Sequence, residues 1–226
     1  MPPHLEVAGD ERAAARRAAE LIAEAGAAAV ADHGYFGFAM SGGRSPWAML
    51  ANLGDLEEMP WGETELFQVD ERIASPGSED RNLTHMVLGL SMDHQSALRP
   101  MPVTQRDLDA AAREYESQLP DSFDLVHLGL GPDGHTASLV PDDAVLEVDD
   151  RKVALTATEY QGHPRMTLTY PAIDAAKRIL FLVTGAEKQD ALAQLLAGDP
   201  SIPAGRVKNE EIIIVADEAA AEGLST

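Results

Sequence analysis

The chain has 226 residues, and its 17 basic and 38 acidic residues give a formal net charge of −21 at pH 7. A surface of this sign repels nucleic-acid backbones and anionic lipids, so nonspecific binding to either is excluded. Hydrophobic residues make up 45% and charged residues 24% of the chain, which is typical of a folded protein. The chain has no cysteine, which excludes disulfides, thiolate nucleophiles and cysteine-bound metals.

The amino-terminal segment lacks the basic start and apolar core of a secretory signal, because charges interrupt its alanine-rich stretch. No window approaches the roughly 20 consecutive apolar residues that cross a bilayer. With the absence of cysteine, which fits a reducing compartment, these features favour a cytoplasmic protein. No long linker or internal repeat occurs, so we expect a single domain over residues 1–226. The acidic surface fits either adaptation to salt or prevention of self-association.

Predicted helices and strands alternate along the chain. Between residues 10 and 31 apolar side chains recur every three or four positions, which predicts a helix with one buried face. The short apolar run at 35–40 predicts a buried strand. Ser45 followed by Pro46 is typical of a helix N-cap and first helical residue, and Gly54 is typical of a helix end. Further strands are predicted at 65–69, 124–128, 179–183 and 212–215, and further helices at 83–90, 105–118 and 187–197.

Strands that alternate with helices of this length imply right-handed crossovers between parallel strands. We therefore predict an α/β fold that is doubly wound and Rossmann-like, with a mostly parallel sheet and helices on both faces. The acidic stretch at 142–151 is expected to be a surface loop.

In such a sheet, ligands bind beyond the carboxyl ends of the strands. The loop after the strand at 35–40 contains Gly42, Gly43, Arg44 and Ser45 and precedes a helix. Glycines let backbone amides approach an anion, and Arg44, Ser45 and the helix dipole favour negative charge, so the loop is a candidate phosphate site. An ordinary tight turn is the alternative, since Walker and dinucleotide-binding patterns are absent from this loop.

Charged residues also follow the strand at 65–69. Asp70 and Arg72 come directly after it, and Arg81 and Asn82 open the next predicted helix. Charged side chains at a strand end either bind a ligand or form a structural network of ion pairs, and the residues alone leave both readings open.

The loop after the strand at 124–128 carries the most specific pattern. Gly131 permits a tight path, and we expect Asp133 and His135 at or near the start of a short helix. The positive end of that helix would keep the histidine neutral and able to accept a proton. Asp133 and His135 lack further ligands with recognisable spacing, so we expect no metal. The six other histidines have no such setting: His4, His33, His85, His94, His127 and His163.

These motifs together resemble the glucosamine-6-phosphate isomerase/6-phosphogluconolactonase family, and most closely its lactonases. The resemblance covers roughly residues 10–216, and its most specific element is GLGPDGHTASLVP. The family more often has Ser-Thr-Pro where this chain has Arg44-Ser45-Pro46, and Ser-Asn where it has Arg81-Asn82. The motifs, in chain order, are SGGRSP at 41–46, VDER at 69–72, RN at 81–82, GLGPDGHTASLVP at 129–141, PRMTLT at 164–169 and TGAEK at 184–188.

The resemblance implies hydrolysis of 6-phospho-D-glucono-1,5-lactone to 6-phosphogluconate in the oxidative pentose phosphate pathway, without metal or organic cofactor. Ester hydrolysis needs a base for the attacking water, a donor for the oxyanion and a clamp on the phosphate. We assign His135 as base, Asp133 as the residue that orients it or its water, and Arg72 as partner of the oxyanion or a hydroxyl. The remaining candidate substrate-binding residues are Gly42, Gly43, Arg44, Ser45, Asp70, Arg81, Asn82, Gly131, Arg165 and Lys188.

For the phosphate we expect the glycine loop, Arg165 and Lys188, because a dianion needs a local basic region on so acidic a protein. Lys188 has an alternative role as a solvated lysine beside a capping box formed by Thr184 and Glu187. The expected partner is the small phosphorylated lactone alone, bound by a monomer or small homo-oligomer.

Three other functions compete with this one. A deaminase of the glucosamine-6-phosphate type carries a glutamate shortly after the histidine, whereas this chain has no carboxylate between His135 and Asp142. A noncatalytic sugar-phosphate sensor is expected to bring a DNA-binding domain, for which the residues before the first predicted strand leave no room. A lactonase for a different phosphorylated lactone stays open, because pocket shape is not readable from sequence.

Overall fold

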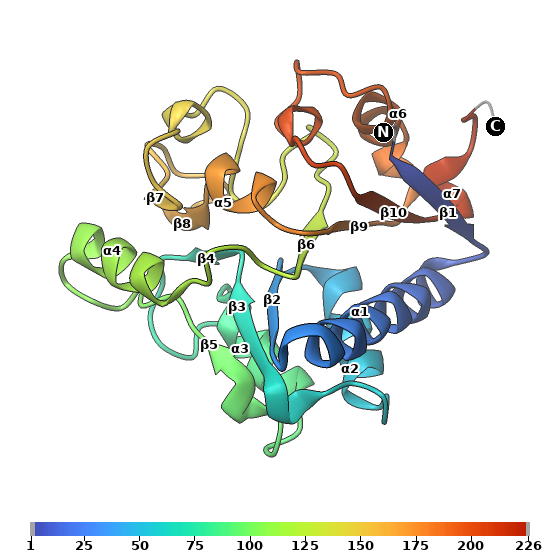
Figure 1. The fold of residues 1–226 in the computed structure, drawn as a ribbon. Helices are drawn as coiled ribbons and strands as arrows, with labels where there is room; N and C mark the ends of the chain where they lie inside the picture. Colours follow the sequence, from blue (N-terminus) through green and yellow to red (C-terminus); the bar gives the residue numbers. More distant parts are fainter. Residues whose placement is uncertain (1–2, 225–226) are drawn as a thin grey trace.

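The computed structural model describes residues 3–224, which form a seven-stranded sheet and a smaller three-stranded one. All pairings in the large sheet are parallel, in the order β1-β10-β9-β6-β2-β3-β5. Figure 1 shows helices above and below this sheet. The predicted doubly wound α/β fold is therefore confirmed. The strands are β1 (His4–Ala8), β2 (Phe36–Met40), β3 (Thr64–Gln68), β5 (Leu98–Arg99), β6 (Leu125–Gly129), β9 (Ile179–Val183) and β10 (Ile212–Asp217).

Two separate hydrophobic cores lie on the two faces of the large sheet. In strand β2, the side chains of Phe36, Phe38 and Met40 pack into one core. The side chain of Ala39, on the opposite face of the sheet, packs into the other core. The first core covers α1 to α3, and the second covers α4 to α7. The helices are α1 (Glu11–His33), α2 (Arg44–Gly54), α3 (Asn82–Gly89), α4 (Leu108–Gln118), α5 (Tyr170–Asp174), α6 (Gln189–Leu196) and α7 (Glu218–Ala221).

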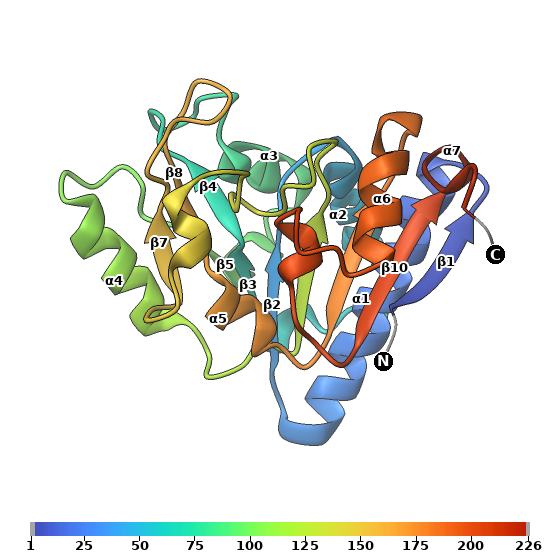
Figure 2. The ribbon, with the colours of Figure 1, turned by 90° about the horizontal axis from the view of Figure 1, so that it is seen from above.

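The small sheet is antiparallel and was not predicted. It consists of β4 (Asp70–Arg72), β8 (Arg165–Leu168) and β7 (Val153–Leu155), with β8 in the middle. Figure 2 shows it beyond β3, at the opposite end of the molecule from β1 and β10. Since β4 begins two residues after β3 ends, the small sheet continues from the carboxyl end of the large one.

Short 3-10 helices connect several elements: η1 (Trp61–Glu63), η2 (Gln95–Ala97), η3 (Ala144–Glu147), η4 (Ala186–Lys188) and η5 (Ala204–Arg206). The acidic stretch at 142–151 contains η3 and is mostly a surface loop, as expected. Asp143 is the exception, because it is buried and accepts hydrogen bonds from the backbone of Val145, Ala157 and Thr158. No helix within residues 3–224 is long and apolar enough to span a bilayer.

Helix α1 begins close to its predicted start, whereas helix α2 has a different N-cap from the predicted one. Asp10 caps α1 by accepting a hydrogen bond from the Ala13 amide at 2.7 Å, one residue from the predicted start. Helix α2 begins at Arg44 with Gly43 as its N-cap, so the prediction of Ser45 as N-cap is wrong. The Ser45 hydroxyl instead donates to Glu11 and contacts the hydroxyl of Thr184 at 2.6 Å.

Candidate active site

A cavity of about 230 Å³ opens where β2, β6 and β9 end and the small sheet begins. The structure brings most of the predicted site residues to its wall. Asp133 and Arg81 are the two that do not line it. The predicted residues that do are Gly42, Gly43, Arg44, Ser45, Asp70, Arg72, Asn82, Gly131, His135, Arg165 and Lys188.

The glycine loop contributes the wall next to β2. Gly42 is required by a close approach, since a Cβ atom there would lie 2.1 Å from Oδ1 of Asn82. Helix α2 starts directly after the loop without a side-chain cap, so its first amides keep their capacity to bind an anion. The loop therefore has the properties of a phosphate site.

Glu71, which the sequence did not single out, organises the chain around β4. Its carboxylate is fully buried and accepts hydrogen bonds from the backbone amides of Arg72, Asn82 and Leu83 at 2.8 to 2.9 Å. Nε of Arg81 lies 3.5 Å from Oε2 of Glu71, and the Arg81 side chain is buried. Arg81 thus takes the alternative role of a structural ion pair, away from the cavity.

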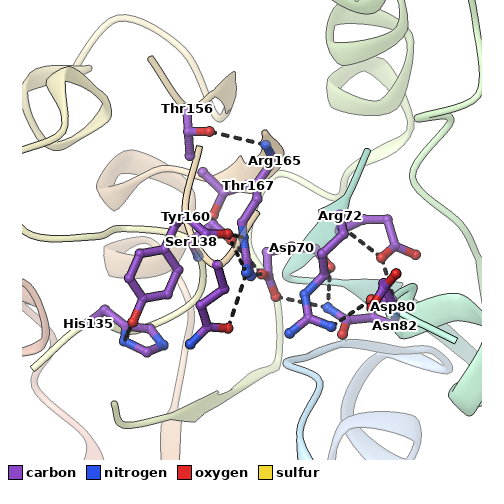
Figure 3. A network of polar contacts seen from close by, with 12 residues as sticks. Asp70, Arg72, Asp80, Asn82, His135, Ser138, Thr156, Tyr160, Arg165 and Thr167 are labelled. Carbon is purple, nitrogen blue, oxygen red and sulfur yellow. Dashed lines mark hydrogen bonds and ion pairs between the residues drawn. The ribbon is translucent and has the colours of Figure 1, made fainter. Parts of the chain in front are cut away.

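Asp70 connects three elements of the wall. One carboxylate oxygen accepts a hydrogen bond from Ser138 at 2.5 Å and lies 3.8 Å from the Arg165 guanidinium. The side-chain amide of Asn82 donates to the backbone carbonyl of Asp70 at 2.9 Å and to the other carboxylate oxygen of Asp70 at 3.3 Å. Asp70 therefore holds three elements in fixed positions around the cavity, namely α3, β8 and the loop that follows β6 (Figure 3).

The two arginines on this wall come from neighbouring strands. Arg72 and Arg165 are directly paired in the antiparallel ladder of β4 and β8. Arg72 donates to the backbone carbonyl of Asp80 at 2.6 Å, and Arg165 donates to the carbonyl of Tyr160 at 3.0 Å. Burial lowers the pKa of Arg165, Asp70 opposes that shift and Arg72 adds to it. Two guanidinium groups so close together favour an anion between or beside them.

His135 reaches the cavity from a loop, not from a helix. The Gly131 amide donates to the His135 carbonyl at 2.8 Å, and a short bridge joins Thr136 and Leu139. The expectation that a helix starts here is wrong, and its dipole does not act on the ring. Gly131 is required here, because a Cβ atom at this position would lie 1.9 Å from Nδ1 of His135.

Asp133 lies behind His135 and orients its ring by a direct contact with Nδ1. Its Oδ1 lies 2.5 Å from Nδ1 of His135, and its Oδ2 accepts a hydrogen bond from the Tyr160 hydroxyl at 2.9 Å. The contact with His135, helped by Tyr160, holds the pKa of Asp133 well below its usual range. An ionised carboxylate on Nδ1 leaves Nε2 as the nitrogen able to accept a proton.

Lys188 lies at the end of η4 and is half-buried at the cavity wall. Burial lowers its pKa, and Glu187 and Asp133 oppose the shift. The capping box predicted from Thr184 and Glu187 does not form, because Gly185 is the N-cap of η4 and no side chain caps this helix. Nine further residues line the cavity, and the polar ones among them are Ser41, Gln161, Thr184 and Glu187. All of these four except Gln161 lie in the motifs at 41–46 and 184–188, which was the available signal.

The remaining histidines do not line the cavity. His127 is fully buried in β6, and burial lowers its pKa to about 3, so it is neutral at physiological pH. Within residues 3–224 no three histidine or carboxylate side chains are grouped as metal ligands.

Sequence comparison identifies the protein family to which this fold and this site belong. Residues 9–215 match the model of the family described as glucosamine-6-phosphate isomerases/6-phosphogluconolactonase, and the chain belongs to this family. It is 34% identical to the 6-phosphogluconolactonase of Synechocystis sp. over 99% of both chains. It is 33% identical to that of Mycobacterium tuberculosis, also over 99% of both.

Solved structures give the same result for the fold. A 6-phosphogluconolactonase from Thermotoga maritima superposes with a TM-score of 0.84 at 25% identity, covering 95% of this chain and 99% of the other. A monomeric glucosamine-6-phosphate deaminase superposes with a TM-score of 0.82 at 18% identity, covering 96% of this chain and 98% of the other. At 18% identity the second likeness shows a shared fold only.

Proposed function

We propose that this chain hydrolyses 6-phospho-D-glucono-1,5-lactone to 6-phosphogluconate, the lactonase step of the oxidative pentose phosphate pathway. Full-length identity of about one third to proteins named 6-phosphogluconolactonase supports the substrate. The observation that carries the chemistry is the Asp133–His135 pair on a cavity whose wall also holds Arg72 and Arg165. A base and an anion clamp in one cavity are what hydrolysis of a phosphorylated ester requires.

In this proposal, Nε2 of His135 takes a proton from water as the water oxygen attacks the lactone carbonyl. The carbonyl oxygen gains negative charge, which Arg72 stabilises by donating from its guanidinium. Collapse of the tetrahedral intermediate breaks the bond between the carbonyl carbon and the ring oxygen. The imidazolium returns its proton to that oxygen, so the products are a carboxylic acid and a hydroxyl, and no metal or organic cofactor takes part in any step.

The phosphate would bind at the start of α2, between Lys188, Arg165 and the amides of the glycine loop. Arg44 and Ser45 complete this region in the chain. Ser45 is already hydrogen-bonded to Glu11 and Thr184, so its amide, not its hydroxyl, is the group we assign to the phosphate. Asp70 and Asn82 line the cavity and are the candidates for binding substrate hydroxyls. Arg81 is paired with Glu71 away from the cavity, so we assign it no contact with the substrate.

What separates this function from that of a deaminase is the loop after His135. Thr136 donates to the Gly129 carbonyl and Ser138 to Asp70, so both hydroxyls have structural partners. No carboxylate follows His135 before Asp142, and ring opening of an amino sugar needs such an acid. All residues assigned above come from one chain, so a monomer has all the groups that the proposed reaction needs. We propose the cytoplasm as the place of the reaction.

The test follows lactone hydrolysis at a pH low enough to slow the spontaneous reaction. Purified protein should accelerate hydrolysis of 6-phosphogluconolactone strongly and that of unphosphorylated δ-gluconolactone weakly. Equal rates on the two lactones would contradict the phosphate site, and no acceleration of either would contradict the proposed function.

A further inference from the structure

Tyr160 lies at the tip of the hairpin that joins β7 and β8. Its amide donates to the carbonyl of His163 at 3.0 Å, and Gln161 and Gly162 between them both have positive φ, 52° and 82°. Two central residues with positive φ form the tight turn that matches the twist of a hairpin. Asp143 anchors the same segment through its hydrogen bonds to Ala157 and Thr158. The tip is therefore held in one conformation.

The Tyr160 side chain touches the catalytic pair directly. Its hydroxyl donates to Oδ2 of Asp133 at 2.9 Å and lies 3.2 Å from Nδ1 of His135. The two rings pack edge to face with centroids 5.1 Å apart. Burial, and then the neighbouring Asp133, raises the pKa of Tyr160 to about 12, so the hydroxyl keeps its proton at neutral pH. Tyr160 does not line the cavity, so it acts through Asp133 and His135.

Tyr160 also touches the arginine assigned to the phosphate. Its backbone carbonyl accepts hydrogen bonds from Nε and Nη2 of Arg165 at 3.3 and 3.0 Å. The Arg165 guanidinium carbon lies 5.2 Å from the centroid of the Tyr160 ring. Figure 3 shows the tyrosine beside both His135 and Arg165. One residue thus connects the proposed base with the proposed phosphate clamp.

For a neutral His135 ring, the hydrogen bonds around Asp133 allow one arrangement of protons. Tyr160 has a single proton, and Asp133 as a carboxylate has none. If Tyr160 donated to Nδ1 of His135, that nitrogen would be an acceptor only 2.5 Å from a carboxylate oxygen, so two acceptors would face each other. Donation to Oδ2 instead leaves Oδ1 to accept the proton on Nδ1. The lone pair of the ring is then on Nε2 of His135, a residue that lines the cavity.

We propose that Tyr160 is a positioning residue: its hydroxyl fixes the Asp133 carboxylate so that His135 keeps its proton on Nδ1 and presents Nε2 as base. Its backbone carbonyl ties this arrangement to Arg165. The consequence for turnover rests on the proposed function, whereas the consequence for the histidine tautomer does not.

The kinetic test uses Tyr160→Phe, with Tyr170→Phe as its matched control. Tyr170 donates its hydroxyl to the carbonyl of Pro203 at 2.8 Å and does not line the cavity, so the control removes the same group elsewhere. Y160F should lower kcat on 6-phosphogluconolactone about 10-fold and change KM less than about twofold, since it loses a hydrogen bond to a charged group behind the base. Y170F should keep the wild-type kcat. Melting temperatures of both variants identify any loss of folded protein.

The second readout is independent of activity. Nitrogen NMR on protein labelled at histidine, recorded above pH 8 and assigned with His135→Asn, distinguishes which ring nitrogen carries the proton. The wild-type protein should show His135 protonated at Nδ1, and Y160F should show a mixture of tautomers. A Y160F protein with the wild-type tautomer overturns the proposal whatever its kcat. If the wild type hydrolyses neither lactone, the proposed function fails, and the tautomer still decides the role of Tyr160.

Discussion

Arg72 and Arg165 lie directly opposite one another on β4 and β8, and both border the same cavity. Like charges facing each other across a ladder are unfavourable, and the nearby Asp70 compensates only one of them. A protein with a net charge of −21 thus has two cationic side chains, one buried and one partly buried, at the wall of the same cavity. The arrangement is favourable when an anionic substrate occupies the cavity, which is the condition for binding a phosphorylated lactone.

Lys188→Ala tests the phosphate site. The Lys188 side chain makes no hydrogen bond or ion pair within residues 3–224, so its removal disturbs the wall less than removal of Arg165, which also holds Tyr160. We expect kcat/KM to fall roughly 10- to 100-fold on 6-phosphogluconolactone, through loss of a charge-assisted contact. Hydrolysis of δ-gluconolactone should change less than about twofold. An equal loss on both lactones would assign Lys188 to folding or chemistry.

His135→Asn tests the base. The substitution keeps polarity and approximate size but removes the proton acceptor, so kcat should fall about 10²- to 10⁴-fold. Binding of 6-phosphogluconate, measured by calorimetry on the same sample, should change little because it depends on the phosphate site. Retention of more than about a tenth of the wild-type kcat would be incompatible with the proposed mechanism.

Gly131→Ala tests the close approach behind the histidine. The added Cβ would lie 1.9 Å from Nδ1 of His135, so the ring or the loop must move. We expect kcat to fall at least about 10-fold while the fold is kept, because small displacements of a base are costly. Gly54→Ala is the matched control, since a Cβ there meets nothing within 4 Å. Equal activity of the two variants would show that the loop adapts.

His127 predicts a pH dependence of stability. Burial lowers its pKa to about 3 in the folded state, while the unfolded chain takes up this proton near pH 6.5. Below pH 6.5 the unfolded state therefore binds more protons than the folded state, and the free energy of unfolding falls as pH falls toward 3. The loss attributable to His127 between pH 7 and pH 5 is on the order of 2 kcal/mol. Urea unfolding at both pH values should show a smaller difference in His127→Leu than in wild type.

The large sheet was predictable because its central strands are continuous apolar runs between helices with clear periodicity. Strand β9 has the predicted ends, and β2, β3 and β6 begin or end within one residue of them. Strand β1 was missed because none of its residues is fully buried and two of its five side chains, His4 and Glu6, are polar. Its place in the sheet depends on pairing with β10, which no local pattern records.

The site was predictable where its residues sit in motifs and not where they depend on the small sheet. Strands β4, β7 and β8 have three or four residues each, too few for a periodic pattern. They pair Asp70 with Thr167 and Arg72 with Arg165, and they bring Tyr160 to Asp133. These contacts join residues up to about a hundred positions apart, so the separate roles of Arg81 and Tyr160 became visible only in three dimensions.

The position of β10 orders the assembly of this chain during its synthesis. Because β10 lies between β1 and β9, β1 has no partner strand in this sheet until β10 has been synthesised. Helix α1 is packed against β10 as well as β2, and side chains of β10 belong to both cores, so both cores stay incomplete until then. A nascent chain that ends before Ile212 therefore exposes the edge of β9 that pairs with β10, together with apolar surface on both faces of the sheet. We expect chaperones to hold the chain longest at that stage.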